Sequence, residues 1–221
     1  MKVVAILQAR LGSTRLPGKV LLPLAGQPMV RQILERVQWA KTLDALVLAV
    51  PGRDAAALAP MAHGLATLYA DPGDEADLVG RYLGAAASVG ADLIVRIPCD
   101  NPCVDPAYVD AAVADYLRDP VIYYSNTTAA CEGQYLDGIG AEVVSLSRLK
   151  WLDQRTRGNP SWREHPHAFF RDYGLLRLPK AEVRLDVNTH EDYLFIQALY
   201  DHFGHPRFTT LEILTYLRSL N

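Results

Sequence analysis

The sequence has few cysteines and no apolar run long enough to cross a membrane. Its three cysteines, Cys99, Cys103 and Cys131, are odd in number and lack Cys-x-x-Cys spacing, which argues against a disulfide framework and favours small buried side chains. No apolar stretch approaches the roughly 20 residues of a membrane-spanning helix. The chain begins with a strand-like segment and shows no signal-peptide pattern. We therefore expect a cytoplasmic protein without a membrane partner.

An excess of basic residues is also absent. The sequence has 22 Lys and Arg residues against 25 Asp and Glu residues, a formal net charge of −3. Proteins that coat nucleic acid carry the opposite balance, so we expect no nucleic-acid partner. Internal repeats and low-complexity segments are lacking as well. A chain of 221 residues fits one domain better than two, and we predict a single domain over residues 1–221.

Short apolar runs alternate with amphipathic stretches through the first half of the chain. The strand candidates are Val3–Gln8, Ala45–Val50, Leu65–Tyr69 and Leu93–Ile97, and the helix candidates are Pro28–Ala40, Asp54–His63, Glu75–Val89 and a helix capped by Asp105 that runs to about Arg118. This alternation predicts an α/β fold with three layers, in which helices cover both faces of a mostly parallel, mixed sheet. Such sheets bind ligands beyond the carboxyl ends of their strands.

The alternation weakens between about residues 121 and 185. Strand candidates there are Val121–Ser125, Ala141–Leu146 and Gly174–Leu178, with irregular polar segments between them. We interpret this region as an insertion that adds antiparallel strands and forms a substrate pocket, a dimer contact or both, and we favour a homodimer. The chain then closes with two predicted helices, His190–Phe203 and Thr209–Leu220.

The loop Gln8–Lys19, with the sequence QARLGSTRLPGK, is the most informative segment. It follows the first predicted strand. Its three cations are Arg10, Arg15 and Lys19, and they lie among the small residues Ala9, Gly12 and Ser13, which allow a close backbone approach. Arginine forks and a lysine charge suit phosphate oxygens, although the Walker pattern is missing. A solvated basic turn is the alternative, but the position at a strand end favours a phosphate site.

A second polar loop, Cys99–Asp105, follows the strand candidate Leu93–Ile97. Because both loops follow strands of one parallel sheet, we expect them to share a crevice. Asp100 would emerge there, where a carboxylate can hold the Mg²⁺ that accompanies a nucleoside triphosphate. Asp100 could instead cap the turn before Pro102. Arg96 lies within the apolar strand, and a buried charge of this kind requires an acidic or anionic partner.

Several segments together resemble a known family, the cytidylyltransferases that make CMP-activated sugars, and in particular the spore-coat polysaccharide biosynthesis protein F group. The resemblance covers nearly the whole chain in order and is carried by QARLGSTRLPGKVLLPLAGQPMV, GDEADLVGRYLGAA, ADLIVRIPCDNPCVDPAYVD, YYSNTT, YLDGIGAEVVS, EHPHAFFR and RLDVNTHEDY. It implies a fold of the nucleotidyltransferase type. It also implies an enzyme that uses Mg²⁺ to transfer CMP from CTP to a small acidic acceptor such as a sugar acid, with release of pyrophosphate.

The resemblance also implies roles for individual residues. Arg15, Lys19 and Asp100 would be catalytic, and Asp100 would bind the metal. The loop residues named above would contact the nucleotide together with Asp77 and Arg81, although these two could simply form a surface ion pair four residues apart on a helix. Asn126 and His165 would contact the acceptor. The grouping of Glu164, His165 and His167 permits a metal site, but a helix start fits it better.

One position departs from the family pattern. Where the family commonly has VDT-x-ED, this chain has VNTHED, so that Asn188 replaces the usual acid. Asp186 lies two residues earlier, on the same face of an extended segment, and we predict that it serves as the second metal ligand. Asn188 could instead ligate through its amide oxygen. Thr189 and Asp192 fit a helix capping box.

Two other functions remain open from the sequence. A nucleotide-sugar-dependent glycosyltransferase can use a similar sheet, but this chain lacks the Asp-x-Asp pattern typical of that class. A nucleotide-binding module without turnover is the second alternative, and Asn188 favours it. The sequence does not identify the acceptor.

Overall fold

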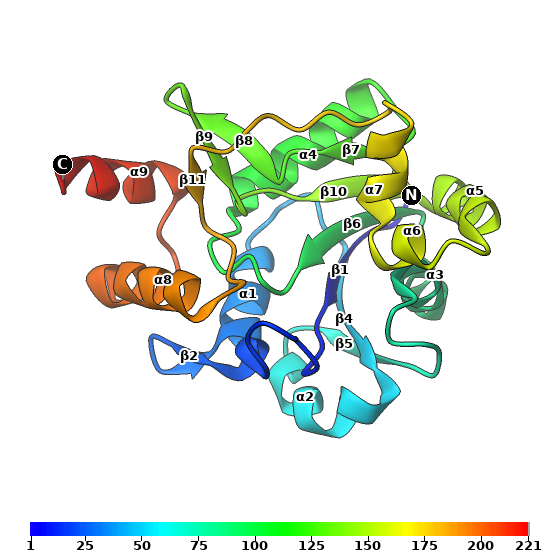
Figure 1. Ribbon diagram of the computed structural model, residues 1–221, viewed down its shortest axis with the longest axis horizontal. Helices are drawn as coiled ribbons and strands as arrows, with labels where there is room; N and C mark the ends of the chain where they lie inside the picture. The colour runs from blue at the N-terminus through cyan, green and yellow to red at the C-terminus, as the bar shows by residue number, and fades with distance from the viewer. Residues whose placement is uncertain (221) are drawn as a thin grey trace.

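The computed structural model describes residues 1–220 and contains a central six-stranded sheet (Figure 1). Its order is β5-β4-β1-β6-β10-β7, with the first four strands parallel and β10 and β7 antiparallel to their neighbours. The strands are β1 (Val3–Gln8), β4 (Ala45–Pro51), β5 (Thr67–Asp71), β6 (Leu93–Pro98), β7 (Tyr124–Ser125) and β10 (Glu142–Ser145). The predicted mixed, mostly parallel sheet is therefore confirmed.

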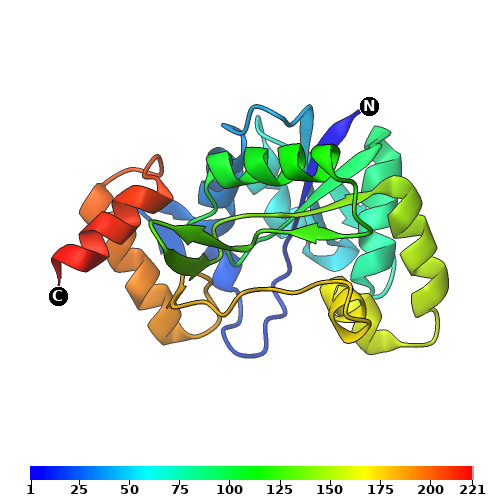
Figure 2. The ribbon, with the colours of Figure 1, turned by 90° about the horizontal axis from the view of Figure 1, so that it is seen from above.

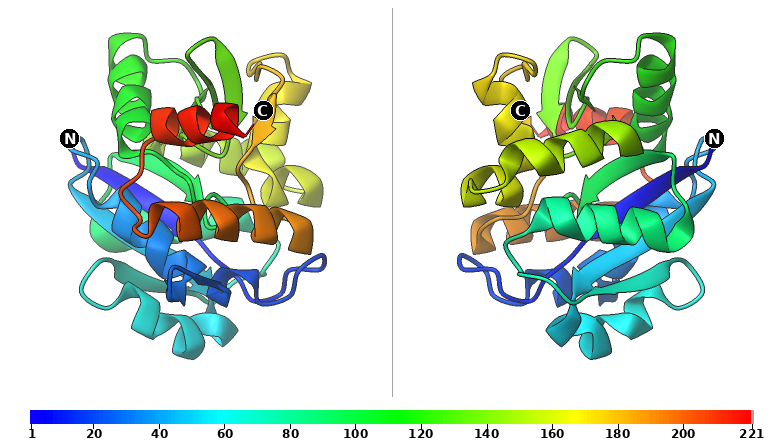
Figure 3. Two further views of the ribbon diagram at one scale, coloured as in Figure 1. Left: turned by 90° about the vertical axis from the view of Figure 1, so that its left-hand side faces the viewer. Right: turned by 90° about the vertical axis from the view of Figure 1, so that its right-hand side faces the viewer.

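Helices cover both faces of this sheet, because alternate residues of the buried strands point to opposite sides. One core joins Val3, Ala5 and Leu7 of β1 to a helix group on one face, and the other joins Val4 and Ile6 to a second group. The first group comprises α1 (Met29–Val37), α2 (Ala55–Ala62), α4 (Pro106–Arg118), α8 (His190–Phe203) and α9 (Thr210–Ser219); the second comprises α3 (Leu78–Val89), α5 (Leu146–Thr156) and α7 (Pro166–Asp172). The two views of Figure 3 show α8 and α9 toward one end and α3 and α5 toward the other.

The region after α4 does add antiparallel strands, as predicted. Besides β7 and β10 it forms a hairpin of β8 (Thr128–Cys131) and β9 (Gln134–Asp137), to which β11 (Val183–Arg184) adds in parallel. The hairpin was not predicted as such. Its turn uses Glu132 and Gly133, both with positive φ, and Glu-Gly is a weaker hairpin signal than Asn-Gly or Asp-Gly.

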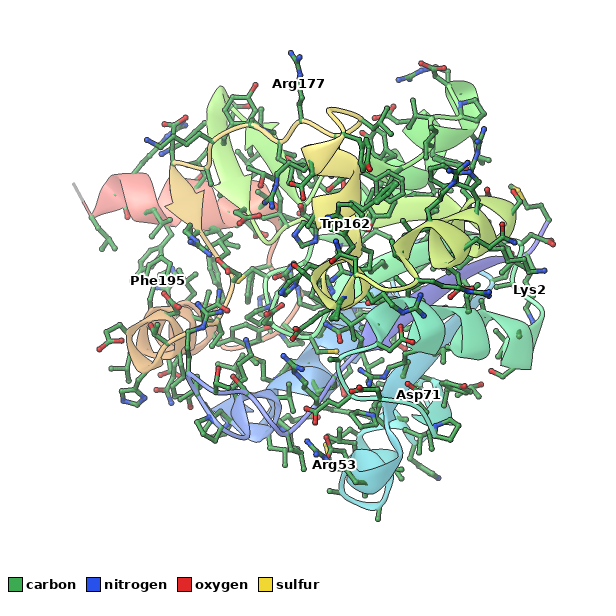
Figure 4. The ribbon with its side chains drawn as sticks, turned by 45° about the vertical axis from the view of Figure 1, so that its right-hand side comes forward. Lys2, Arg53, Asp71, Trp162, Arg177 and Phe195 are labelled. Carbon is green, nitrogen blue, oxygen red and sulfur yellow. The ribbon has the colours of Figure 1, made fainter. Side chains whose placement is uncertain are left out.

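The strand predicted at Gly174–Leu178 is wrong. After α7 the backbone amides of Leu175 and Leu176 donate to Phe170 O, at 2.7 and 3.2 Å, so these groups close the end of a helix instead of entering a strand ladder. The chain then crosses without regular structure from α7 to β11 (Figures 1 and 2). Arg177 on this segment points away from the body of the molecule (Figure 4).

Most other predicted elements are confirmed, with shifts of a few residues at their ends. Asp105 caps α4 by accepting from Ala107 N, and Thr189 and Asp192 form the predicted capping box of α8. Elements that the sequence did not suggest include β2 (Pro23–Leu24), β3 (Gln27–Pro28), α6 (Pro160–Glu164), α5 and β11. No helix in the described part of the chain has the length and apolar character needed to span a membrane.

The register of the sheet places the two polar loops side by side. In the β1–β6 pair, Gln8 lies opposite Pro98, the last residues of their strands. Both strands run in the same direction, so the loops that follow them leave the same edge of the sheet at the same level.

Candidate active site

A cavity of about 620 Å³ opens beyond the carboxyl ends of β1 and β6. The loop after β1 contributes Ala9, Arg10, Ser13, Arg15 and Lys19 to its lining, and the loop after β6 contributes Cys99, Asp100 and Asn101. The expectation that these loops share one crevice is therefore confirmed. The opposite wall comes from the segments between α5 and α8, whose side chains include Glu164, His165, His167, Arg171, Arg184 and Asp186.

The loop after β1 is held in shape by its own backbone. Gly18 N donates to Leu11 O at 3.0 Å, and Gly18 has φ +68°, a conformation that glycine adopts without steric cost. Gly12 does not line the cavity. A Cβ there would lie 2.8 Å from Glu75 Oε1 and 3.0 Å from Arg53 Nη2. The absence of a side chain at Gly12 therefore lets this ion pair pack against the loop.

Each cation of the loop already contacts oxygen atoms. Lys19 Nζ lies 3.1 Å from Asp100 Oδ2 and donates to Val187 O at 2.6 Å. Arg15 Nη2 donates to Asn188 Oδ1 at 2.6 Å. Arg10 lies 3.2 Å from Glu164 and 3.8 Å from Glu75. These contacts place all three cations at the cavity with their donors directed toward oxygen, which is the arrangement that phosphate oxygens require.

Two carboxylates of the cavity lie on neighbouring segments. Val187 N donates to Asp100 O at 2.7 Å, so the backbone beside Asp186 runs against the backbone at Asp100. Asp186 receives two hydrogen bonds from Arg184, at 3.0 and 2.7 Å, and one from Asn188 Nδ2. Asp192 does not line the cavity, and its Oδ2 accepts from the backbone N–H groups of Asn188 and of Thr189, the latter in the capping box.

The donor set fits Mg²⁺ in one specific way. Among the described residues, no group of three or more His, Cys, Asp or Glu side chains is placed to hold a metal ion, and the possible site at Glu164, His165 and His167 is therefore not supported. Mg²⁺ is commonly bound by only one or two carboxylates together with substrate phosphates and water. Asp100 and Asp186 both line the cavity and carry oxygen atoms of this kind.

Asp77 and Arg81, expected to contact the nucleotide, do not line the cavity. They also do not pair with each other, because α3 begins three residues later than predicted and Asp77 is its N-cap, accepting from Gly80 N. Asp77 pairs with Arg163 at 2.7 Å. Arg81 is fully buried and pairs at 3.1 Å with Asp71, which is labelled at the end of β5 in Figure 4. Both residues hold structural elements together.

Asn126, expected to contact the acceptor, is likewise absent from the lining. Its Nδ2 donates to Tyr108 O at 2.8 Å and its Oδ1 accepts from Ala141 N at 2.9 Å. The amide therefore ties the start of the hairpin to β10 and α4. The following residues, Thr127 and Thr128, reach the cavity instead, whereas His165 lines it as expected.

The relationship to known proteins is clear over nearly the whole chain. A model of the cytidylyltransferase family matches residues 4–203. The chain belongs to the cytidylyltransferase family. It is 29% identical to the spore coat polysaccharide biosynthesis protein SpsF of Bacillus subtilis, over 97% of this chain and 93% of that protein. It is 33% identical to the 8-amino-3,8-dideoxy-manno-octulosonate cytidylyltransferase of Shewanella frigidimarina, over 95% and 75%.

A solved structure supports the same family. The cytidylyltransferase of Leptospira borgpetersenii serovar Hardjo-bovis superimposes with a TM-score of 0.87 at 26% identity, covering 99% of this chain and 94% of that one. The resemblance inferred from the sequence motifs and the predicted fold of the nucleotidyltransferase type are therefore confirmed, and the chain is an enzyme of the cytidylyltransferase class.

The wall of this cytidylyltransferase cavity contains a buried ion pair that the sequence only partly revealed. Arg96 of β6 lies directly opposite Glu142 of β10 in the sheet register, and the two side chains form a salt bridge. Tyr82 OH accepts from Arg96 at 3.0 Å and Tyr123 OH donates to Glu142 at 2.6 Å. Despite burial, the charge of Arg96 lowers the pKa of Glu142 below its usual value. The prediction that Arg96 has an acidic partner is confirmed.

The signal for this partner was present in the sequence. Glu142 is a charged residue within the apolar run Ala141–Leu146, and a buried carboxylate in such a run requires a cation. The aromatic side chains nearby are mainly core residues, as expected. Tyr123 stacks on Phe170 with ring centroids 4.3 Å apart. Cys99 and Cys103 are buried, and all three cysteines are free thiols.

Proposed function

We propose that this cytidylyltransferase uses Mg²⁺ and CTP to attach CMP to a hydroxyl group of a sugar acid, releasing pyrophosphate. The observation that carries the proposal is the convergence of Arg10, Arg15 and Lys19 with Asp100 in one cavity, in a chain of this family. The names of the Bacillus and Shewanella relatives point to polysaccharide biosynthesis and to a sugar acid as acceptor.

The loop after β1 is suited to bind the triphosphate. Arg10, Arg15 and Lys19 would exchange their present oxygen partners for phosphate oxygens, and the side chains are already directed into the cavity. Positioning of the α-phosphorus and neutralisation of charge on the departing pyrophosphate account for most catalysis in phosphoryl-type transfers. Ala9 and Ser13 line the same region and would contribute backbone and hydroxyl donors.

Asp100 and Asp186 would hold Mg²⁺. When bound, the ion would neutralise phosphate charge and polarise the α-phosphate. Among the described side chains Asp100 contacts only Lys19, so it has more freedom to bind the metal. Asp186 would exchange at least one of its bonds to Arg184 and Asn188 for the metal.

The insertion at about residues 121–185 would form the acceptor pocket. Thr127, Thr128, His165 and Arg171 line the cavity on that side. Donors of this kind suit the hydroxyl and carboxylate groups of a sugar acid. Reaction in the cytoplasm, a single domain and a homodimer through this region remain predictions from the sequence.

One observation favours a second function, nucleotide binding without turnover. Asn188 stands where the family commonly has an acid, and it binds both Arg15 and Asp186. Release of pyrophosphate that depends on both CTP and a sugar acid would exclude this alternative. CTP binding without release would support it.

We expect CTP to stabilise the protein against heat more than ATP, GTP or UTP. The ligand that binds the folded state most tightly raises the melting temperature most at equal concentration. The measurement is a thermal-shift titration with each triphosphate in the presence of Mg²⁺. Equal shifts for all four nucleotides, or a larger shift with ATP, would contradict the assignment of CTP.

Asn188→Asp is expected to strengthen Mg²⁺ binding in the presence of CTP. An ionised carboxylate binds a hard cation better than a neutral amide does, and the new carboxylate would lie beside Asp186. The measurement is the Mg²⁺ concentration that gives half-maximal pyrophosphate release. We expect this concentration to fall several-fold. An unchanged value would show that position 188 lies outside the metal's coordination sphere.

A further inference from the structure

A polar contact in the wall of the cavity is incomplete. His167 Nδ1 is buried and has no hydrogen-bond partner among the described residues. It lies 3.9 Å from Glu142 Oε1, which is too long for a hydrogen bond. Glu142 directs its other oxygen, Oε2, to Arg96 and Tyr123. A buried nitrogen and a carboxylate oxygen that accepts no hydrogen bond from the described residues therefore face each other.

The surrounding charges determine where the proton of His167 lies. Burial is the main cause that lowers the pKa of His167 below 6.5; Arg96, His165 and Arg171 act in the same direction, and Glu142 opposes them. The ring is thus neutral near pH 7, whereas Glu142 is ionised. A neutral imidazole beside a carboxylate carries its hydrogen on the facing nitrogen, because a lone pair there would be repelled. We therefore expect Nδ1 to be the protonated nitrogen.

The other ring nitrogen is consequently free to accept a proton. About 30% of the His167 side chain is exposed, and the residue lines the cavity. Because Nδ1 is buried, Nε2 is the ring nitrogen that can face the cavity. Helix α7 is fixed in place by the stacking of Phe170 on Tyr123, the same tyrosine that donates to Glu142. Nε2 is then the unprotonated nitrogen available to a bound substrate.

We propose that His167, oriented by Glu142, is the general base of this enzyme and takes the proton from the hydroxyl group of the acceptor substrate. This inference rests on the proposed function. As the acceptor's O–H bond breaks, its electron pair forms the new bond to the α-phosphorus of CTP, and the bond from this phosphorus to the pyrophosphate oxygen breaks. The proton moves to Nε2. The resulting imidazolium is stabilised by Glu142 through Nδ1–H and later loses the proton to solvent.

The first test reads the tautomer in the protein without substrates. ¹⁵N-labelled histidine spectra at neutral pH distinguish the two neutral tautomers from the imidazolium, and His167→Gln identifies the signal of His167 among the 6 histidines. We expect a neutral ring protonated on Nδ1. A ring protonated on Nε2, or an imidazolium at neutral pH, would overturn the proposal whatever the enzyme's acceptor.

The second test is kinetic and uses CTP, Mg²⁺ and 3-deoxy-manno-octulosonate with its 8-amino analogue as probes. Because His167 must be neutral to act, kcat/KM of the parent enzyme should fall as the pH drops through a pKa below 6.5. His167→Gln should lower kcat about 100-fold or more, leave the KM for CTP nearly unchanged and remove this acid limb. His165→Gln should raise the KM for the acceptor and keep the limb, and the exposed His63→Gln should change neither.

The outcomes separate the two claims. A His167→Gln enzyme with parental kcat and the same acid limb would overturn the role of His167 while leaving the proposed function intact. Absence of pyrophosphate release with every sugar acid would count against the proposed function, and the histidine spectra would still decide whether Glu142 orients His167. Glu142→Gln is unsuited to this test, because it leaves the buried Arg96 without its carboxylate partner.

Discussion

Asp100→Asn should reduce pyrophosphate release about a thousandfold while the protein remains folded. The substitution keeps the shape of the side chain but removes the charge that would hold Mg²⁺ against the triphosphate. A metal ion contributes several kcal/mol of charge stabilisation in the transition state, and about 4 kcal/mol corresponds to roughly a thousandfold in rate. The measurement is a Mg²⁺ titration of CTP-dependent pyrophosphate release.

The expected effect on stability is small. The Asp100 side chain is 31% exposed and contacts Lys19, and partly exposed pairs of this kind contribute about 0.2–1 kcal/mol. Asp119→Asn is a matched control, since Asp119 is exposed at the end of α4 and its side chain has no hydrogen bond or ion pair among the described residues. A parental Mg²⁺ dependence in Asp100→Asn would exclude the proposed metal site.

Lys19→Met should reduce turnover by about 100- to 1,000-fold, the usual cost of removing one preorganised donor from an active site. Methionine retains much of the aliphatic volume but cannot interact with phosphate oxygens. We expect binding of CTP to weaken at the same time, because the lysine charge would attract the triphosphate before and during the reaction. Pyrophosphate release and calorimetric CTP titration measure the two effects.

Lys19 also contributes to stability, more than a loop charge in solvent would. Its side chain is 11% exposed, and its ammonium group contacts Asp100 and Val187 O. We therefore expect Lys19→Met to cost about 1–2 kcal/mol of unfolding free energy. The exposed Lys150→Met serves as the control. A variant that binds and turns over CTP normally, but unfolds at much lower denaturant concentration, would make Lys19 a purely structural residue.

The elements that place the cavity were predictable because they follow from local rules. Val3–Gln8 and Leu93–Ile97 read as strands buried on both faces, and parallel strands deliver their following loops to one edge. In the structure, the register that sets Gln8 opposite Pro98 brings the two loops together. Lys19 and Asp100 could thus be placed in one crevice from the sequence, whereas their direct contact is seen only in the structure.

Two residues expected at the site, Arg81 and Asn126, do not line the cavity and have partners far away in the chain. Arg81 looked available on a helix surface, but tertiary packing turns it into the core against Asp71. Asn126 resembles a pocket residue, but both ends of its amide are used by backbone groups of Tyr108 and Ala141. Hydrogen-bond partners of this kind are set by how elements pack, and spacing along the chain does not reveal them.

Sequence spacing also does not reveal how Arg96, Glu142 and His167 come together in the cavity wall. The sequence shows one charged residue within each of two apolar strands, but the pairing of these two residues depends on β10 lying antiparallel beside β6. The position of His167 depends further on the packing of α7 against Tyr123. An insertion without a regular repeat of strands and helices gives no sequence rule for either arrangement.

The most direct test of the central claim is ³¹P NMR of CTP incubated with the enzyme, Mg²⁺ and a panel of sugar acids that includes 3-deoxy-manno-octulosonate. We predict that the triphosphate signals are replaced, only when a suitable sugar acid is present, by equal amounts of pyrophosphate and a CMP phosphodiester. Persistence of CTP with every sugar acid, or formation of free CMP and pyrophosphate regardless of the acceptor, would contradict the proposed cytidylyl transfer.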